Sequence, residues 1–331
     1  MSDAVVRDIA ALLERAGVGG EVVPSVSMAE LWARFEVARA TAVTAETMRG
    51  HRSRWSRWVE PFVGEMPIGE VGPAVVDELV GRVAATGAAS NAKKVYLTLC
   101  AMFDVAVRYR LIGEHPLRGQ VNVPKSRAAE RPLPTDDDMS AIWAELEYLD
   151  DLRWLAFFRL AWATGARPAE LCALRWEDVT VGVDEAARTV HIGGGLQRVA
   201  GGQQVGTGKS SNARRDVVVD AETARIMTMW WASQDPLAAW VFPAVTNLAV
   251  PMSPDAASRR WRQLREQCGL DPRIRLYDLR HRFGTRAMAA GFSPVDVAAQ
   301  LGNTAALVMD TYGHKSNVGE QISDAVTKEE S

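Results

Sequence analysis

An aperiodic stretch with three prolines constrains the fold most, because it separates two different hydrophobic patterns. The stretch LRGQVNVPKSRAAERPLP has prolines at positions 124, 132 and 134 and no helical or strand repeat. Such a sequence favours an interdomain linker, which we place at residues 119–133. A chain of 331 residues is long enough for two cores. We therefore expect one domain at residues 26–118 and a second at 134–314.

The first of these domains has the pattern of a helical bundle. The segment SMAELWARFEVARA predicts one helix, and Thr44 is expected to cap a second that runs to Phe62. Valines and leucines at 75–83 mark a third, and Ser90 or Asn91 is expected to cap a fourth. Four helices with short connections predict a compact all-α bundle.

The second domain mixes helices with short strands. Thr135 is expected to cap a helix, with Asp138 in the capping-box position, and a second helix should stop at Gly165. Residues 186–220 alternate like strands joined by glycine-rich turns, and helices return from Ala221. We expect a mainly α fold with a small antiparallel β-sheet. A short amphipathic helix within residues 1–25 and a tail at 315–331 complete the chain.

Composition favours a protein of the reducing cytosol. The cysteines Cys100, Cys172 and Cys268 are odd in number and far apart, so they form no disulfide or metal pattern. No apolar run is long enough to span a bilayer, which predicts a cytoplasmic protein with no membrane partner. The net charge of −3 hides separate basic clusters, although solvated helix faces explain such clusters equally well.

Two segments carry an arginine suited to holding a phosphate. Arg167, in ATGARPAELCALRW, precedes a helix that starts at Pro168, where exposed N–H groups favour an anion, and Glu170 can orient its guanidinium. Arg280, in LYDLRHRFGTR, has Tyr277 one helical turn before it. An isolated surface Arg–Glu pair and an amphipathic helix are the ordinary alternatives.

The hairpin-like segment GTGKSSNARRDVVVD offers a further cation, Lys209. It nearly matches a phosphate-binding P-loop, but Gln203 replaces the required glycine and a strand-like sequence follows the lysine. The P-loop interpretation therefore fails, and a lysine at the tip of a β-turn remains. The segment SPVDVAAQLGNTAALVMDTYGH predicts two helices around a Leu-Gly turn, with Tyr312 in the last turn.

Taken together and in this order, these segments resemble the tyrosine recombinase family of phage integrases and Xer-type recombinases. The family shows the frames A-T-G-x-R-x-x-E-L, K-T-x-x-S-x-R-x-V, H-x-L-R-H, and L-G-H followed by a tyrosine nine positions on. The resemblance covers residues 26–314 and implies a helical core-site DNA-binding domain before the catalytic domain.

The resemblance also implies a reaction and its residues. Tyr312 would attack the scissile phosphate to give a 3′-phosphotyrosyl link. Arg167 and Arg280 would neutralise the phosphoryl oxygens, and Lys209 would protonate the leaving 5′-oxygen. No cofactor is then required, neither a metal nor a nucleotide.

Double-stranded DNA is the implied partner, bound by a homo-oligomer that forms a tetrameric synapse, with a directionality factor as a possible accessory. The expected DNA contacts are basic residues of both domains. They are Arg49, Arg52, Arg57, Lys93, Lys94, Arg215, Arg259 and Arg262.

Three positions depart from the family pattern. Tyr277 stands at a usual histidine, Asn303 at a histidine or tryptophan, and Ala213 at the hairpin serine. A phenol and an amide can donate hydrogen bonds but are poor proton shuttles near neutral pH. We therefore expect cleavage that depends more heavily on Lys209, with His281 in a supporting role. A catalytically weakened DNA-binding regulator and a type IB topoisomerase-like enzyme stay open as alternatives.

Overall fold

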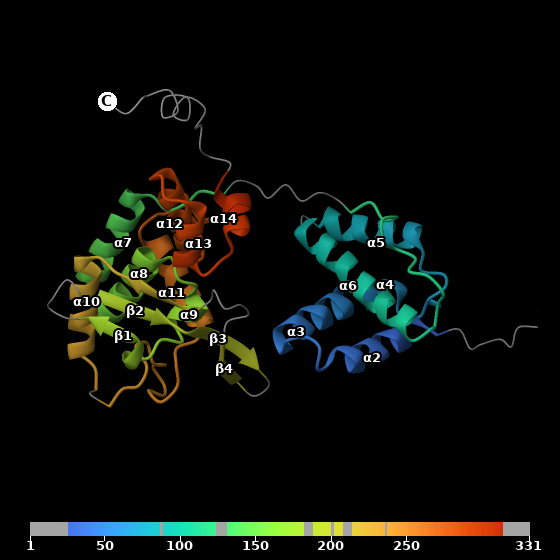
Figure 1. Ribbon diagram of the computed structural model, residues 1–331, viewed down its shortest axis with the longest axis horizontal. Coiled ribbons are helices and arrows are strands. Elements are labelled where there is room, and N and C mark those ends of the chain that lie inside the picture. The colour runs from blue at the N-terminus through green and yellow to red at the C-terminus, as the bar shows by residue number, and fades with distance from the viewer. Residues whose placement is uncertain are drawn as a thin grey trace, which may run out of the picture. The chain divides into compact units, whose positions relative to one another are not determined.

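The computed structural model describes residues 26–86, 89–123, 131–181, 188–199, 202–207, 214–235 and 237–313. Two compact units make up the chain, Met1–Ala129 and Glu130–Ser331 (Figure 1). The division falls inside the segment 119–133. The helix expected within residues 1–25, Lys209, Ala213 and the tail at 315–331 lie outside the described residues.

Helices make up the first unit, as the sequence predicts. They are α2 (Met28–Arg39), α3 (Ala45–Arg54), α4 (Glu60–Val63), α5 (Pro73–Ala85) and α6 (Ala89–Arg108). Thr44 caps α3 as predicted, by accepting a hydrogen bond from the Thr47 amide. A π-helical turn, η1 (Trp55–Val59), joins α3 to α4 and was not expected.

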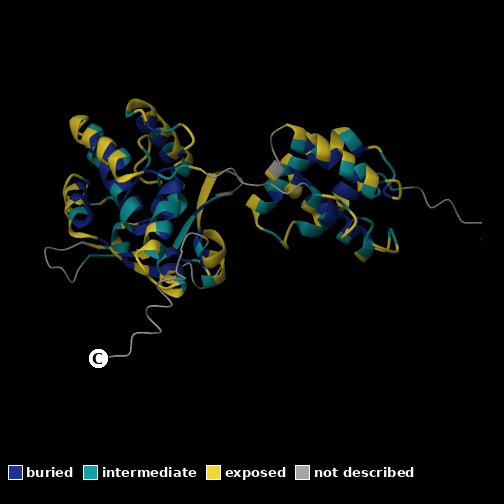
Figure 2. Ribbon diagram, turned by 90° about the horizontal axis from the view of Figure 1, so that it is seen from above, coloured by how far each residue is buried: buried dark blue, intermediate teal, exposed yellow. Residues whose placement is uncertain are grey.

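The predicted cap of the fourth helix is wrong. The helix α6 begins at Ala89, so Ser90 and Asn91 lie inside its first turn. Polar residues are tolerated there because the first amides of a helix have no intrahelical partner. The helices of this unit turn their apolar sides inward (Figure 2). Trp32 stacks on Trp55 with ring centroids 4.9 Å apart, and Phe35 and Phe103 are fully buried.

The second unit is also mainly helical. Its helices are α7 (Asp136–Tyr148), α8 (Leu152–Thr164), α9 (Pro168–Leu171), α10 (Ala221–Ala232), α11 (Pro254–Gln267), α12 (Asp278–Ala289), α13 (Pro294–Leu301) and α14 (Ala305–Tyr312). Thr135 and Asp138 form the predicted capping box of α7. The last three helices pack on one another (Figure 1). In the part of the chain described, no helix is long and apolar enough to cross a membrane.

In the described part of this unit, two small antiparallel sheets accompany these helices where the sequence predicted one. Strands β1 (Val179–Val181), β2 (Arg188–Ile192) and β5 (Arg215–Val218) form one sheet in the order β1-β2-β5. Strands β3 (Gly194–Val199) and β4 (Gly202–Thr207) form the other. The segment around Lys209 therefore links β4 to β5, which pair with β3 and β2 and not with each other. The hairpin predicted at GTGKSSNARRDVVVD is wrong on this point.

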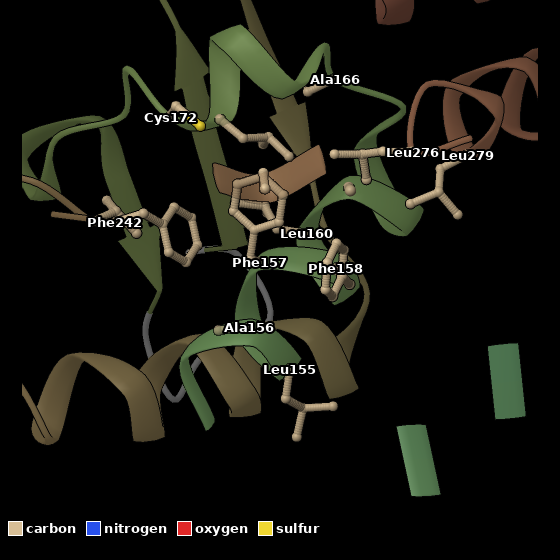
Figure 3. Close-up of a cluster of buried hydrophobic side chains, with 14 of the residues drawn as sticks. Leu155, Ala156, Phe157, Phe158, Leu160, Ala166, Cys172, Phe242, Leu276 and Leu279 are labelled. Atoms are coloured by element: carbon tan, nitrogen blue, oxygen red, sulfur yellow. The ribbon is translucent and has the colours of Figure 1, made fainter. Parts of the chain in front are cut away.

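The core of the second unit is built around α8. Phe157 packs edge-on against Phe158 and Phe242, with centroids 5.4 and 5.0 Å apart (Figure 3). Leu160 and Leu279 are buried in the same cluster. This packing fixes α8, and the C-terminal end of α8 leads directly into the segment that carries Arg167.

Candidate active site

The turn after α8 presents Arg167. Gly165 ends the helix with a φ of 61°, as predicted, and Arg167 is the residue before α9 with Pro168 at its first position. A side chain at Gly165 would lie 2.8 Å from Phe283 and Leu301. Glycine is therefore needed both for the left-handed backbone and for close approach of α12 and α13.

The buried carboxylate of Glu170 binds the guanidiniums of Arg167 and Arg215. Its Oε1 accepts from Arg167 Nη1 at 2.6 Å, and its Oε2 accepts from Arg215 Nη2 at 2.9 Å. Burial raises the pKa of this carboxyl, but the hydrogen bond and charge of Arg215, followed by those of Arg167, outweigh burial and hold it below its usual value. Glu170 therefore stays ionised and fixes both arginines.

Arg215 does not take the position expected of a DNA contact. Its side chain is 6% exposed, and its Nε donates to the carbonyl of Gln300 at 2.7 Å. The guanidinium of Arg215 is thus held by partners inside the protein and does not lie on the surface. Its location instead ties β5 and α13 to Glu170, so we reassign it from DNA contact to support of the site.

Arg280 belongs to the same cluster and is deeply buried. Its side chain is fully enclosed, with the residue 2% exposed. Its Nη1 donates to the Gly165 carbonyl at 2.9 Å and its Nη2 to the Leu301 carbonyl at 2.6 Å. Burial, followed by the charge of Arg167, lowers the pKa of this guanidinium. The carbonyl that Arg280 Nη1 binds is two residues before Arg167, so the two arginines, 113 positions apart in the numbering, belong to one cluster.

Asn303 and Tyr277 flank the more open guanidinium. Asn303 Oδ1 accepts from Arg167 Nη2 at 2.7 Å, and Gly302 before it has a φ of 63° at the end of α13. Burial lowers the Arg167 pKa, but Glu170 and then Tyr277 outweigh burial and raise it. Tyr277 precedes α12 and is 39% exposed, so this phenol and Arg167 form the accessible edge of the cluster.

Tyr312 ends α14 and turns its ring into the cluster. The residue is 7% exposed, and its hydroxyl lies 3.4 Å from His281 Nδ1. The ring rests on Gly284, where a Cβ atom would come within 2.6 Å of it. Burial raises the pKa of the phenol, whereas the charges of Arg280 and Arg167 act in the opposite direction.

The predicted catalytic and supporting residues that the structure describes thus meet at one place. Arg167, Glu170, Tyr277, Arg280, His281, Asn303 and Tyr312 form one cluster from α9, α12, α14 and the turns beside them. Lys209 is outside the described residues, and Arg215 has the supporting position given above. Three guanidiniums against one carboxylate make the cluster strongly positive, which suits a phosphate.

Sequence reasoning missed Gly284. It lies inside α12, where glycine costs about 1 kcal/mol relative to alanine, and that cost was the available signal of a packing requirement.

The first unit carries a separate basic hollow of about 400 Å³ on α3, η1 and α6. Arg54, Arg57 and Lys94 line it, together with Ser53 and Asn91. Arg54 was not among the predicted DNA contacts. Its Nε donates to Thr98 Oγ1 at 2.8 Å, which points the guanidinium in a fixed direction.

Of the other predicted DNA contacts, some pair with a carboxylate and others are exposed to solvent. Arg49 and Arg52 form ion pairs with Glu46 and Glu36. Lys93 is exposed on α6, and Arg259 and Arg262 are exposed on α11.

Comparisons with known proteins agree with this arrangement. Residues 134–317 match the family model described as the phage integrase family. The chain is 26% identical over 303 residues to the integrase of Mycobacterium phage L5, covering 88% of this chain and 78% of the relative. It is also 26% identical to tyrosine recombinase XerC of Xylella fastidiosa, covering 76% of this chain and 80% of the relative.

Solved structures show the same fold. The Tn1549 transposon integrase has a TM-score of 0.78 and 18% identity, covering 92% of this chain and all of that one. A lambda integrase dimer has a TM-score of 0.67 and 18% identity, covering 95% of this chain and 88% of that one. The family model spans more than half of the chain. The chain is therefore a member of the phage integrase family of tyrosine recombinases.

Proposed function

We propose that this recombinase cuts and rejoins double-stranded DNA at specific sites through a covalent 3′-phosphotyrosyl intermediate on Tyr312. One observation carries the proposal: a tyrosine hydroxyl, from the last helical turn of α14, shares one buried cluster with two arginines from distant segments. That combination supplies a nucleophile and positive charge for a phosphodiester.

In this mechanism Tyr312 attacks the phosphorus and the 5′-oxygen leaves. Arg167 and Arg280 stabilise the charge that builds on the non-bridging oxygens. A guanidinium has five N–H donors, so the two that Arg280 gives to backbone carbonyls fix its plane and leave others for a phosphate. Asn303 holds the Arg167 guanidinium in position by accepting its hydrogen bond. It takes the place of the family's usual histidine or tryptophan. Lys209 protonates the leaving oxygen.

The cluster must open for this to happen. Arg280 and Tyr312 are 2% and 7% exposed in the free chain, whereas Arg167 and Tyr277 are accessible. We expect the phosphate to meet Arg167 and Tyr277 first and to reach Arg280 once neighbouring side chains have moved. The energy for that movement comes from phosphate contacts elsewhere on the protein.

Those contacts include the basic hollow of the first unit. Arg54, Arg57 and Lys94 offer three positive charges to a DNA backbone from neighbouring helices. Structures of related proteins support a DNA partner. The Tn1549 integrase is in complex with a circular intermediate DNA, and lambda integrase is a tetramer on a Holliday junction. We propose that this chain likewise acts as a tetramer on paired sites.

Covalent trapping on a nicked suicide substrate tests the proposal. The DNA should come from the flanks of the gene that encodes the chain, where we expect the target site to lie. Wild type should accumulate a protein–DNA adduct that resists denaturant, and Tyr312→Phe should bind the same DNA without forming it. Equal inertness of both proteins on DNA that they bind would support the weakened, regulatory alternative. Relaxation of plasmids without site preference would support the topoisomerase-like alternative.

A further inference from the structure

The nucleophile must lose a proton, and Tyr277 and Asn303 leave no imidazole at the positions where the family usually has one. A phenol that carries its own hydrogen and a carboxamide are both poor proton acceptors, so neither Tyr277 nor Asn303 takes over the role of an imidazole. The amide oxygen of Asn303 is also occupied by Arg167. Another group has to take the proton from Tyr312.

His281 is in the position to do so. Its Nδ1 lies 3.4 Å from the Tyr312 hydroxyl, and the two ring centroids are 6.0 Å apart. The contact follows from the helix: His281 and Gly284 are three residues apart on α12, so they share one face. Because Gly284 lacks a side chain, the phenol ring settles there and its hydroxyl points to the imidazole. The sequence predicted only a supporting role for this histidine.

We propose that His281 is the catalytic residue that accepts the Tyr312 proton during DNA cleavage, an inference that rests on the proposed function. The Tyr312 oxygen forms a bond to phosphorus while the bond from phosphorus to the 5′-oxygen breaks. The phenolic proton passes to His281 Nδ1, and the leaving oxygen takes a proton from Lys209. In rejoining, the 5′-hydroxyl gives its proton to Lys209 as its oxygen bonds to phosphorus, the bond from phosphorus to the Tyr312 oxygen breaks, and His281 returns its proton to the departing phenol.

The surroundings of His281 keep it in the accepting form. Burial, followed by the charges of Arg275 and Arg280, lowers its pKa, and Asp278 opposes them only in part. The rings of Tyr277 and Tyr312 lie near the imidazole, at centroid distances of 5.2 and 6.0 Å. The imidazole is therefore neutral near pH 7 and can accept at Nδ1 when Nε2 carries the hydrogen. The other described histidine of this unit is His191 on β2, and its Nδ1 lies 2.7 Å from Asp216 Oδ1 on β5.

The variant His281→Asn tests the role, because an amide can keep the hydrogen bond but cannot accept the proton. Single-turnover cleavage of the suicide substrate should slow by about 10²- to 10⁴-fold, the usual share of a general base. The wild-type rate should level off once the pH exceeds the lowered pKa of His281. The variant rate should keep rising into the alkaline range, where the phenol ionises unaided. His191→Asn is the matched control and should cleave at the wild-type rate.

A fluorinated tyrosine at position 312 separates proton transfer from mere support. Its phenol ionises more readily, so it should restore cleavage by His281→Asn near neutral pH. A histidine that only positions the ring would show no such rescue. If wild type cleaves and His281→Asn cleaves equally fast, the proposal for His281 is wrong. It is also wrong if His281→Asn is slow and the fluorinated tyrosine does not restore its cleavage. Failure of wild type to form any adduct would instead overturn the proposed function.

Discussion

The contact between Tyr312 and Gly284 gives a sharp prediction. In Gly284→Ala the new Cβ atom would lie 2.6 Å from the Tyr312 ring, whereas ordinary contacts begin near 3.4 Å. The ring, the helix or both must shift by about 0.8 Å. A misplacement of about 1 Å in a reacting group costs on the order of 10²-fold in rate. We therefore expect cleavage to fall about 100-fold, equivalent to ~2.7 kcal/mol of barrier.

Stability should change much less than the rate. Alanine is favoured over glycine inside a helix by about 1 kcal/mol, and overpacking costs about 1–3 kcal/mol. The net change in unfolding free energy should therefore stay within about 2 kcal/mol. The control is Gly81→Ala, at an exposed helical position of α5 with no atom near the added methyl. It should raise stability slightly and leave cleavage unchanged.

The assay is single-turnover adduct formation on the suicide substrate, with DNA binding and thermal unfolding measured on the same preparations. Gly284→Ala should bind DNA like wild type and cut it slowly. Cleavage of this variant at the wild-type rate would refute the reasoning, because it would mean that the Tyr312 ring does not need its place on α12.

Three further expectations follow from the site and the basic hollow. Glu170→Gln should destabilise the second unit by about 3–5 kcal/mol in denaturant unfolding, because it removes the carboxylate that neutralises the enclosed Arg215 and the half-buried Arg167. Since the Glu170 pKa is lowered in the folded state, its stabilisation should be present above the usual glutamate pKa of about 4.3 and be lost as the pH falls through its lower folded value. Unchanged acid unfolding in Glu170→Gln would contradict that assignment. Asn303→Leu should slow cleavage by about 10- to 150-fold through loss of a hydrogen bond to a charged group worth about 1.5–3 kcal/mol, with DNA affinity nearly unchanged. A wild-type rate would show that Arg167 does not depend on Asn303. Arg57→Ala and Lys94→Ala should each weaken DNA binding and reduce the slope of log affinity against log salt by about 1. Slopes equal to wild type would remove the hollow from the DNA interface.

Much of this arrangement follows from local patterns. Caps such as Thr44 and Thr135 depend on one side chain and a few amides, so the sequence is enough to place them. The left-handed Gly165 and the start of α9 at Pro168 are local in the same way. The order of Arg167, Arg280 and Tyr312 then indicated one site, because each stands in a distinctive frame.

What the sequence did not predict depends on contacts between distant segments. Arg215 is in a basic run and looked like a DNA contact, but Glu170, 45 positions earlier, draws it into the interior. Strands β4 and β5 follow each other in sequence and yet join different sheets, since β2 offers β5 a partner. The Tyr312–His281 contact requires α14 to fold back on α12, which no local pattern reports.

The identity of the residue that becomes linked to DNA tests the central claim most directly. Adducts trapped on the suicide substrate can be digested with protease and nuclease and mapped by mass spectrometry. We expect the nucleotide remnant on the peptide that contains Tyr312, attached through the phenolic oxygen. A remnant on any other residue, or no adduct from wild-type protein on DNA that it binds, would contradict the account.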